Sequence, residues 1–137
     1  MIHVSDLMTD KVFTLQRIDT LRDVRSLMDL GRIRHIPVVD EQGKFLGLVT
    51  HRDLLSFTVS KLANIEDVVQ SELESSIMVG DIMRTDVATV SPDTLLKEAA
   101  TILYKNKYGC LPVLEGEKLV GIITESDFLR LAIALLG

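Results

Sequence analysis

The sequence contains only one cysteine, Cys110, among 137 residues. A single cysteine excludes an intramolecular disulfide and a zinc site built from several thiolates. The three histidines, His3, His35 and His51, do not show the spacing of metal ligands. We therefore expect a cytoplasmic protein that holds no metal ion and no cofactor.

Targeting and membrane-spanning segments are lacking as well. The first residues, Met1 to Asp6, include neither a basic region nor an apolar one, so we expect no secretory signal. The most apolar stretch, Leu129 to Leu136, is interrupted by Arg130 and is too short to span a bilayer. The sequence therefore predicts no membrane partner.

No part of the chain is strongly basic. The formal charge is −5. Residues 1–57 carry eight basic and eight acidic side chains, residues 58–79 carry one and four, and residues 80–137 carry six and eight. This balance argues against direct nucleic-acid binding, which needs a concentrated basic surface. A small anionic ligand stays compatible with it if a few cations gather in the first half.

Sequence motifs of catalysis are missing too. The chain has no phosphate-binding loop of the Gly-x-x-x-x-Gly-Lys-Ser/Thr type, no Gly-x-Gly-x-x-Gly and no nucleophile elbow around a serine. A nucleotide hydrolase is the enzymatic alternative, but no base and nucleophile stand together in the sequence to support it. We expect a protein that is not an enzyme.

The sequence does contain a long internal repeat. Residues 37–55 form two apolar runs around an Asp-Glu-Gln-Gly turn, followed by a helix start, and residues 112–129 repeat this pattern. The two copies are related by a shift of 75 residues that becomes 74 after the second turn. This shift aligns Asp6, Met8, Val12, Thr14, Leu21, Pro37, Val38, Gly47, Thr50 and Asp53 with Asp81, Met83, Val87, Thr89, Leu96, Pro112, Val113, Gly121, Thr124 and Asp127.

Each copy predicts the order β-α-β-β-α, which places the protein in the mixed α/β (α+β) class. Residues 12–15 form a β-prone run, and a helix begins after Asp19-Thr20 and ends at Gly31. We divide the chain into a first motif at 1–57, a helical linker at 58–79 and a second motif at 80–137. The linker places an apolar stripe opposite acidic residues, with Asn64 as an internal cap; the stripe is Leu62, Ile65, Val68, Val69, Leu73 and Ile77, and the acids are Glu66, Asp67, Glu72 and Glu74.

A Thr-x-x-Asp motif begins the last helix of each copy, as Thr50 to Asp53 and as Thr124 to Asp127. Such a motif can be a capping box and nothing more. It also lies where a strand passes into a helix N-terminus, whose free amides can hold an anion. Because the motif recurs after the same strand in both copies, we favour a ligand role in which the carboxylate binds a hydroxyl pair, as acidic residues bind ribose.

Four cationic or titratable residues flank the first of these motifs. Arg34 and His35 precede the hairpin, and His51 and Arg52 follow it. Individually they are solvated side chains, but together they would form a rim suited to phosphate. The second copy has Gly109, Cys110, Glu125 and Ser126 at these positions, so we expect the first site to favour phosphorylated ligands more strongly. Cys110 itself starts a strand, where a cysteine is most often a small core residue and rarely a reactive thiol.

The repeated unit, with its His-Ile-Pro-Val-Val, Gly-Leu-Val-Thr-His-Arg-Asp and Gly-Ile-Ile-Thr-Glu-Ser-Asp segments, resembles the CBS-domain family over nearly the whole chain. Members carry these domains in pseudo-twofold tandem pairs, called Bateman modules. The resemblance implies two clefts between the repeats that bind adenosine compounds such as AMP, ADP, ATP or S-adenosylmethionine. It assigns the ribose to Asp53 and Asp127, and it carries the remaining nucleotide contacts over to Val12, Thr14, His35, Ile36, Pro37, Thr50, His51, Arg52, Val87, Thr89, Cys110, Leu111, Pro112 and Thr124. Arg34 joins this set as part of the cationic rim.

The family also implies a role. We expect a regulatory sensor that acts on a protein partner in trans, with an adenine nucleotide as ligand, and that forms a homodimer by packing helices together. The apolar residues that we expect at the dimer surface are Val24, Leu27, Met28, residues 54–57 and residues 128–136. The alternative is a structural oligomerisation or docking module whose clefts are empty.

Overall fold

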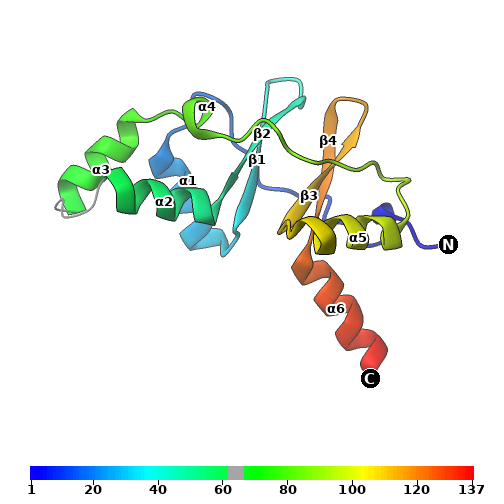
Figure 1. Ribbon diagram of the computed structural model, residues 1–137. Helices are drawn as coiled ribbons and strands as arrows, with labels where there is room; N and C mark the ends of the chain where they lie inside the picture. The colour runs from blue at the N-terminus through cyan, green and yellow to red at the C-terminus, as the bar shows by residue number, and fades with distance from the viewer. Residues whose placement is uncertain (62–66) are drawn as a thin grey trace. The chain divides into compact units, whose positions relative to one another are not determined.

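The computed structural model describes residues 1–61 and 67–137, and the side chains of these residues except 58–61, 67, 68 and 71. Helices alternate with two-stranded antiparallel sheets, which confirms the mixed α/β class (Figure 1). The chain forms two compact units. We call residues 13–86 the central unit, and residues 1–12 together with 87–137 the split unit.

The central unit is built on a β-hairpin that is followed directly by a helix, as predicted. Its turn is fixed by Asp40, whose Oδ1 accepts hydrogen bonds from the backbone N–H groups of Gln42 and Lys44, both at 2.9 Å. Gly43 adopts a positive φ of 85°, which favours glycine. The elements of this unit are α1 (Leu21–Gly31), β1 (His35–Val39), β2 (Phe45–Thr50), α2 (His51–Lys61), α3 (Asp67–Ser76) and α4 (Val79–Ile82).

The apolar core of the central unit corrects part of the expected dimer surface. Val24, Met28 and Leu54 are all buried in this core, so they are not available to a second subunit. They lie on the inward faces of α1 and α2, where the 3.6-residue period directs them toward the sheet. The buried cluster consists of Leu15, Leu21, Val24, Met28, Ile36, Val38, Val49, Leu54 and Val79.

Helix α3 differs from the predicted linker. Glu74, expected on the polar face, is 2% exposed and forms an ion pair with Arg25 of α1, with Nη2 and Oε2 2.8 Å apart. Val69 and Leu73, expected in the packed stripe, are exposed. The periodicity was misleading because a buried carboxylate with a well-placed guanidinium can take a core-facing position. The expectations for Leu62, Asn64, Ile65, Glu66 and the Asp67 and Val68 side chains lie outside the described residues.

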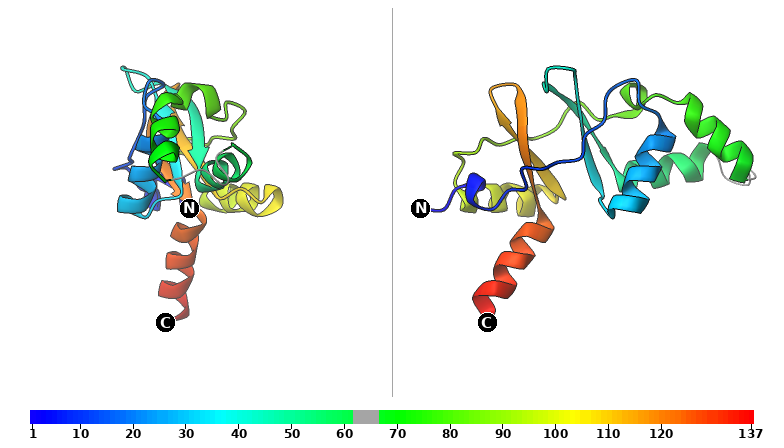
Figure 2. Two further views of the ribbon diagram at one scale, coloured as in Figure 1. Left: turned by 90° about the vertical axis from the view of Figure 1, so that its left-hand side faces the viewer. Right: turned by 180° about the vertical axis from the view of Figure 1, so that it is seen from behind.

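The split unit repeats this architecture. Its elements are the short 3₁₀ helix η1 (Val4–Asp6), α5 (Leu96–Asn106), β3 (Cys110–Glu115), β4 (Lys118–Thr124) and α6 (Glu125–Leu136). Its core consists of Val4, Val90, Leu96, Ala99, Leu103, Leu111, Val113 and Ile123. From the end of β4, α6 extends away from the β3–β4 hairpin (Figure 2). Within residues 1–61 and 67–137, no helix has the length and apolar character needed to cross a membrane.

The strand expected at residues 12–15 is reduced to a single parallel bridge between Leu15 and Val38, and Val90 and Val113 form the equivalent bridge in the split unit. The reason is that only one residue of each run reaches the hairpin: Leu15 N–H donates to Pro37 O at 3.0 Å, and Leu15 O accepts from Val39 N–H at 2.9 Å. Each run therefore adds one rung to the sheet.

The segment that begins each sequence copy packs in the compact unit formed by the rest of the other copy. Thr9 pairs with Ile122 of β4, and Arg84, its counterpart in the repeat, pairs with Leu48 of β2; each pair exchanges two backbone hydrogen bonds of 2.9 Å. Gly47 of β2 permits this approach, because a Cβ atom there would lie 2.7 Å from the Arg84 carbonyl oxygen. The compact units therefore divide the chain after residues 12 and 86. The division at 57 and 79 stays a prediction about the sequence motifs.

Candidate functional site

The corner between β2 and α2 places Asp53 beside Thr50. Asp53 Oδ2 accepts hydrogen bonds from the Thr50 backbone N–H at 3.0 Å and from Thr50 Oγ1 at 2.9 Å. The Asp53 N–H donates back to Thr50 Oγ1 at 3.2 Å. This reciprocal arrangement is a capping box. It fixes one carboxylate oxygen at the start of α2 and leaves Oδ1 for another partner.

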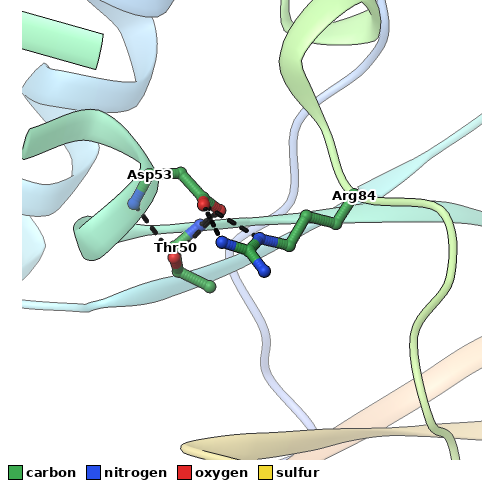
Figure 3. A network of polar contacts seen from close by, with 3 residues as sticks. All are labelled: Thr50, Asp53 and Arg84. Carbon is green, nitrogen blue, oxygen red and sulfur yellow. Dashed lines mark hydrogen bonds and ion pairs between the residues drawn. The ribbon is translucent and has the colours of Figure 1, made fainter. Parts of the chain in front are cut away.

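Arg84, from the segment after α4, takes the second oxygen of Asp53 (Figure 3). Its Nε and Nη2 donate to Asp53 Oδ1 at 2.9 and 2.6 Å. Burial alone would raise the pKa of Asp53, but the hydrogen bonds from Arg84 and Thr50 outweigh burial and lower it. The carboxylate is therefore ionised at neutral pH. Its contribution to stability is present above the ordinary aspartate pKa and is lost as the pH falls through the lowered value.

Two residues of the predicted cationic rim, Arg34 and His51, lie together at this corner. The His51 N–H donates to the Arg34 carbonyl oxygen at 2.8 Å, which brings the two side chains together. Arg34 Nη1 lies 3.1 Å from His51 Nδ1. Because a guanidinium can only donate, His51 Nδ1 is the acceptor in this contact. His35 pairs with Thr50 across the hairpin, and Arg52 is exposed on the first turn of α2.

The split unit has the same corner with a different charge. Thr124 caps α6, and Asp127 Oδ2 accepts from the Thr124 N–H at 2.8 Å. Asp127 Oδ1 accepts from Nη2 of Arg130, one turn further along the same helix. The Glu125 N–H donates to the Gly109 carbonyl oxygen at 3.2 Å, which repeats the His51–Arg34 bond. Where the central unit carries arginine and histidine side chains, this corner carries an exposed glutamate.

A third capping box separates the two interpretations of these aspartates. Asp23 accepts the Thr20 N–H at 2.8 Å at the start of α1, in a box of the same kind. Asp23 is exposed. The side chains of Asp53 and Asp127, in contrast, are only 15% and 6% exposed, and each holds an arginine on its second oxygen. Capping alone does not require a largely buried carboxylate with a cation on its second oxygen, so these two corners differ from the Asp23 cap in burial and in charge pairing.

The remaining predicted site residues differ in their exposure. Thr14 and Thr89 are exposed immediately before Leu15 and Val90, which bond to Pro37 O and Pro112 O at 3.0 and 3.1 Å. The side chains of Ile36, Pro37, Leu111 and Pro112 are buried, so these positions can offer a ligand mainly their backbone. Val12 and Val87 are half-buried and both belong to the split unit.

Cys110 is a core residue, as expected. It begins β3, pairs with Thr124 and is 5% exposed. Burial raises the pKa of its thiol to about 12, so it is protonated and unreactive at neutral pH. Within the described part of the chain, no group of three or more histidine, cysteine, aspartate or glutamate side chains is placed to hold a metal ion.

A cavity of about 390 Å³ in the central unit lies apart from these residues. None of its lining residues belongs to the predicted set; they are Gln16, Arg17, Ile18, Val39, Asp40, Glu41, Gln42 and Leu46.

Sequence reasoning missed Arg84 and Arg130. Arg84 lies 31 positions from Asp53 and reaches it only because the leading segments are exchanged between the units. Arg130 offered a clearer signal, since a residue three positions after Asp127 lies on the same helix face.

Comparison with known proteins assigns the fold to a family. The family model "CBS domain" matches residues 4–60 and again 79–134. The chain belongs to the CBS domain family and carries the domain twice. A CBS domain-containing protein of Dictyostelium discoideum is 31% identical over 134 residues, which cover 97% of this chain and 92% of that protein.

Solved structures of similar proteins share this fold. A Vibrio cholerae protein assigned to acetoin utilization (AcuB) is 45% identical with a TM-score of 0.85, covering 99% of this chain and 93% of that one. CBSX2 of Arabidopsis thaliana, in complex with AMP, is 25% identical with a TM-score of 0.83 and complete coverage of both chains. The chain spans between 21% and 64% of the length of three longer curated relatives, which include a dehydrogenase and an acetyltransferase.

Proposed function

We propose that this chain is a regulatory module that binds an adenosine-containing ligand at its strand-to-helix corners and passes the signal to a protein partner. The observation that carries the proposal is Asp53, a partly buried, ionised carboxylate at a helix N-terminus with the Arg84 guanidinium on its second oxygen. The AMP complex of CBSX2 supports the choice of ligand. We propose a binding role and no catalysis. The buried, protonated Cys110 is compatible with the cytoplasmic location, which stays a prediction.

Each part of an adenine nucleotide has a partner of suitable chemistry. The ribose hydroxyls donate to the Asp53 carboxylate. The phosphate lies near the N–H groups at the start of α2 and near Arg34 and Arg52, which can bind it with charge-assisted hydrogen bonds. The adenine packs near Thr14 and Pro37, where backbone groups and small side chains meet. The split unit offers Asp127 and Thr124 in the same way, but its exposed Glu125 repels a phosphate.

The regulatory mechanism follows from differential binding. A ligand that prefers one arrangement of the protein shifts a pre-existing equilibrium toward that arrangement. We propose that the protein acts as a homodimer, with α6 as the contact, because Leu129, Ile133 and Leu136 recur on one exposed face of this helix. The same face supports the second candidate function, an assembly or docking module that binds no nucleotide.

A thermal-shift panel separates the two functions. We expect AMP, ADP, ATP or S-adenosylmethionine at millimolar concentration to raise the melting temperature, because a ligand that binds only the folded state stabilises it by mass action. At a concentration 100 times the dissociation constant the stabilisation is about 2.7 kcal/mol. Matched guanosine compounds serve as controls. If no adenosine compound shifts the melting temperature, the assembly module is the better account.

A further inference from the structure

At the position of Arg84, the two copies of the repeat have the same backbone pairing but different side chains. It corresponds to Thr9, and both residues exchange two 2.9 Å backbone hydrogen bonds with the neighbouring strand. Its Cα position is therefore fixed by the sheet, while 61% of its side chain is exposed. The backbone pairing therefore does not depend on where the guanidinium lies. At the equivalent position the split unit has Thr9, which carries no charge.

Arg84 occupies the part of Asp53 that a ribose would need. Oδ2 already accepts two hydrogen bonds from Thr50, and Oδ1 accepts two from Arg84. A carboxylate offers about four acceptor sites, so Asp53 is saturated. A hydroxyl pair can bind Asp53 only when Arg84 gives up at least one of its bonds. In the split unit, Arg130 Nη2 approaches Asp127 Oδ1 from within the same helix, so no separate segment is released there.

The consequence for a ligand depends on its charge. A neutral nucleoside that displaces Arg84 breaks an ion pair and gives the guanidinium no new partner except water. A nucleotide that carries a phosphate offers the planar guanidinium of the displaced Arg84 a pair of anionic oxygens, which it can bind in a bidentate manner. Arg84 then exchanges the Asp53 carboxylate for the ligand's phosphate at little cost in free energy. Arg34 and Arg52, which are exposed at the same corner, add to the attraction for the phosphate.

We propose that Arg84 makes the central unit select phosphorylated over neutral adenosine ligands, by leaving Asp53 for the ligand's phosphate when the ribose binds. The inference rests on the proposed function. It adds a specificity-determining residue, and it assigns the two corners different preferences: anionic ligands in the central unit, and neutral or zwitterionic ones beside Glu125 in the split unit.

The test is calorimetric titration of AMP and of adenosine into the wild-type chain and the Arg84→Thr variant, which installs the residue of the other copy. Loss of the charge-assisted bonds to phosphate lowers AMP affinity about tenfold or more. Adenosine affinity stays the same or rises, because Asp53 is no longer occupied. The ratio of the AMP to the adenosine association constant therefore falls at least about tenfold.

Arg22→Thr, which removes an exposed arginine from α1, controls for the loss of one charge and should leave the ratio unchanged. Arg84→Lys keeps the charge but not the bidentate geometry, so it should give a ratio of association constants between those of wild type and Arg84→Thr. It replaces Arg84→Thr in the test if that variant does not fold. If wild type binds AMP and both Arg84 variants keep the wild-type ratio, the inference is wrong while the proposed function stands. If wild type binds neither compound, both fail.

Discussion

At the scale of single residues, the sequence could predict the motif but not its full environment. The spacing Thr-x-x-Asp identified Asp53 and Asp127, and the structure confirms that both close capping boxes. The same local geometry exists at Asp23, so local geometry does not define a binding site. What distinguishes Asp53 is a side chain that is only 15% exposed and an ion pair with Arg84, which comes from a segment far away in the sequence.

The contribution of Arg84 could not be read from periodicity. A lone arginine after a short helix is most often a solvated side chain, and its counterpart in the repeat is a threonine. Its approach to Asp53 follows from backbone pairing with Leu48, which no pattern of side chains specifies. Glu74 illustrates the same limit in reverse, because a carboxylate placed on the polar side of a helical pattern is buried by its pairing with Arg25.

At the scale of the elements, the strongly periodic segments were predictable and the weakly periodic ones were not. Both hairpins and the helices that follow them form as expected, since alternating apolar residues, a turn glycine and a capping residue all favour them. The β-prone run at residues 12–15 has the right composition but only one residue in the sheet.

Helix α6 provides the prediction at this scale. Ile133 is 70% exposed in the middle of its apolar face, so Ile133→Glu should abolish the proposed dimer by placing a charge in the contact. Sedimentation velocity measures the result. Leu30→Glu, at an 88% exposed position near the end of α1, is the matched control and should leave the dimer intact. A wild-type chain that sediments as a monomer at all concentrations would refute the proposed dimer.

At the scale of the whole molecule, residues that are neighbours in the sequence do not always belong to the same compact unit. Residues 1–12 precede the first motif in the chain but pack with residues 87–137. Val4 is fully buried in the core of the split unit, and its N–H donates to the Thr94 carbonyl oxygen at 2.8 Å. A repeat in the sequence shows that two similar halves exist. It does not show which leading segment joins which half.

Val4→Asp tests this arrangement. An uncompensated charge in the core should destabilise the split unit by roughly 3–5 kcal/mol. Hydrogen exchange should then show lost protection in residues 87–137, while residues 13–57 keep theirs. The only two tyrosines, Tyr104 and Tyr108, lie in the split unit and report its unfolding by fluorescence. Ile2→Asp, at a 58% exposed position, is the control. Lost protection confined to residues 13–57 would contradict the exchange of segments.

The most direct test of the binding site is a calorimetric titration of AMP into three proteins: wild type, Asp53→Ala and Asp23→Ala. Both variants lose a capping carboxylate, but only Asp53→Ala removes the group assigned to the ribose. We predict that Asp53→Ala loses about tenfold or more in affinity, the equivalent of roughly 1.5 kcal/mol of charge-assisted hydrogen bonding, and that Asp23→Ala binds as wild type does. Equal affinities for wild type and Asp53→Ala, or equal losses in the two variants, would show that Asp53 is a helix cap and not a ligand-binding residue.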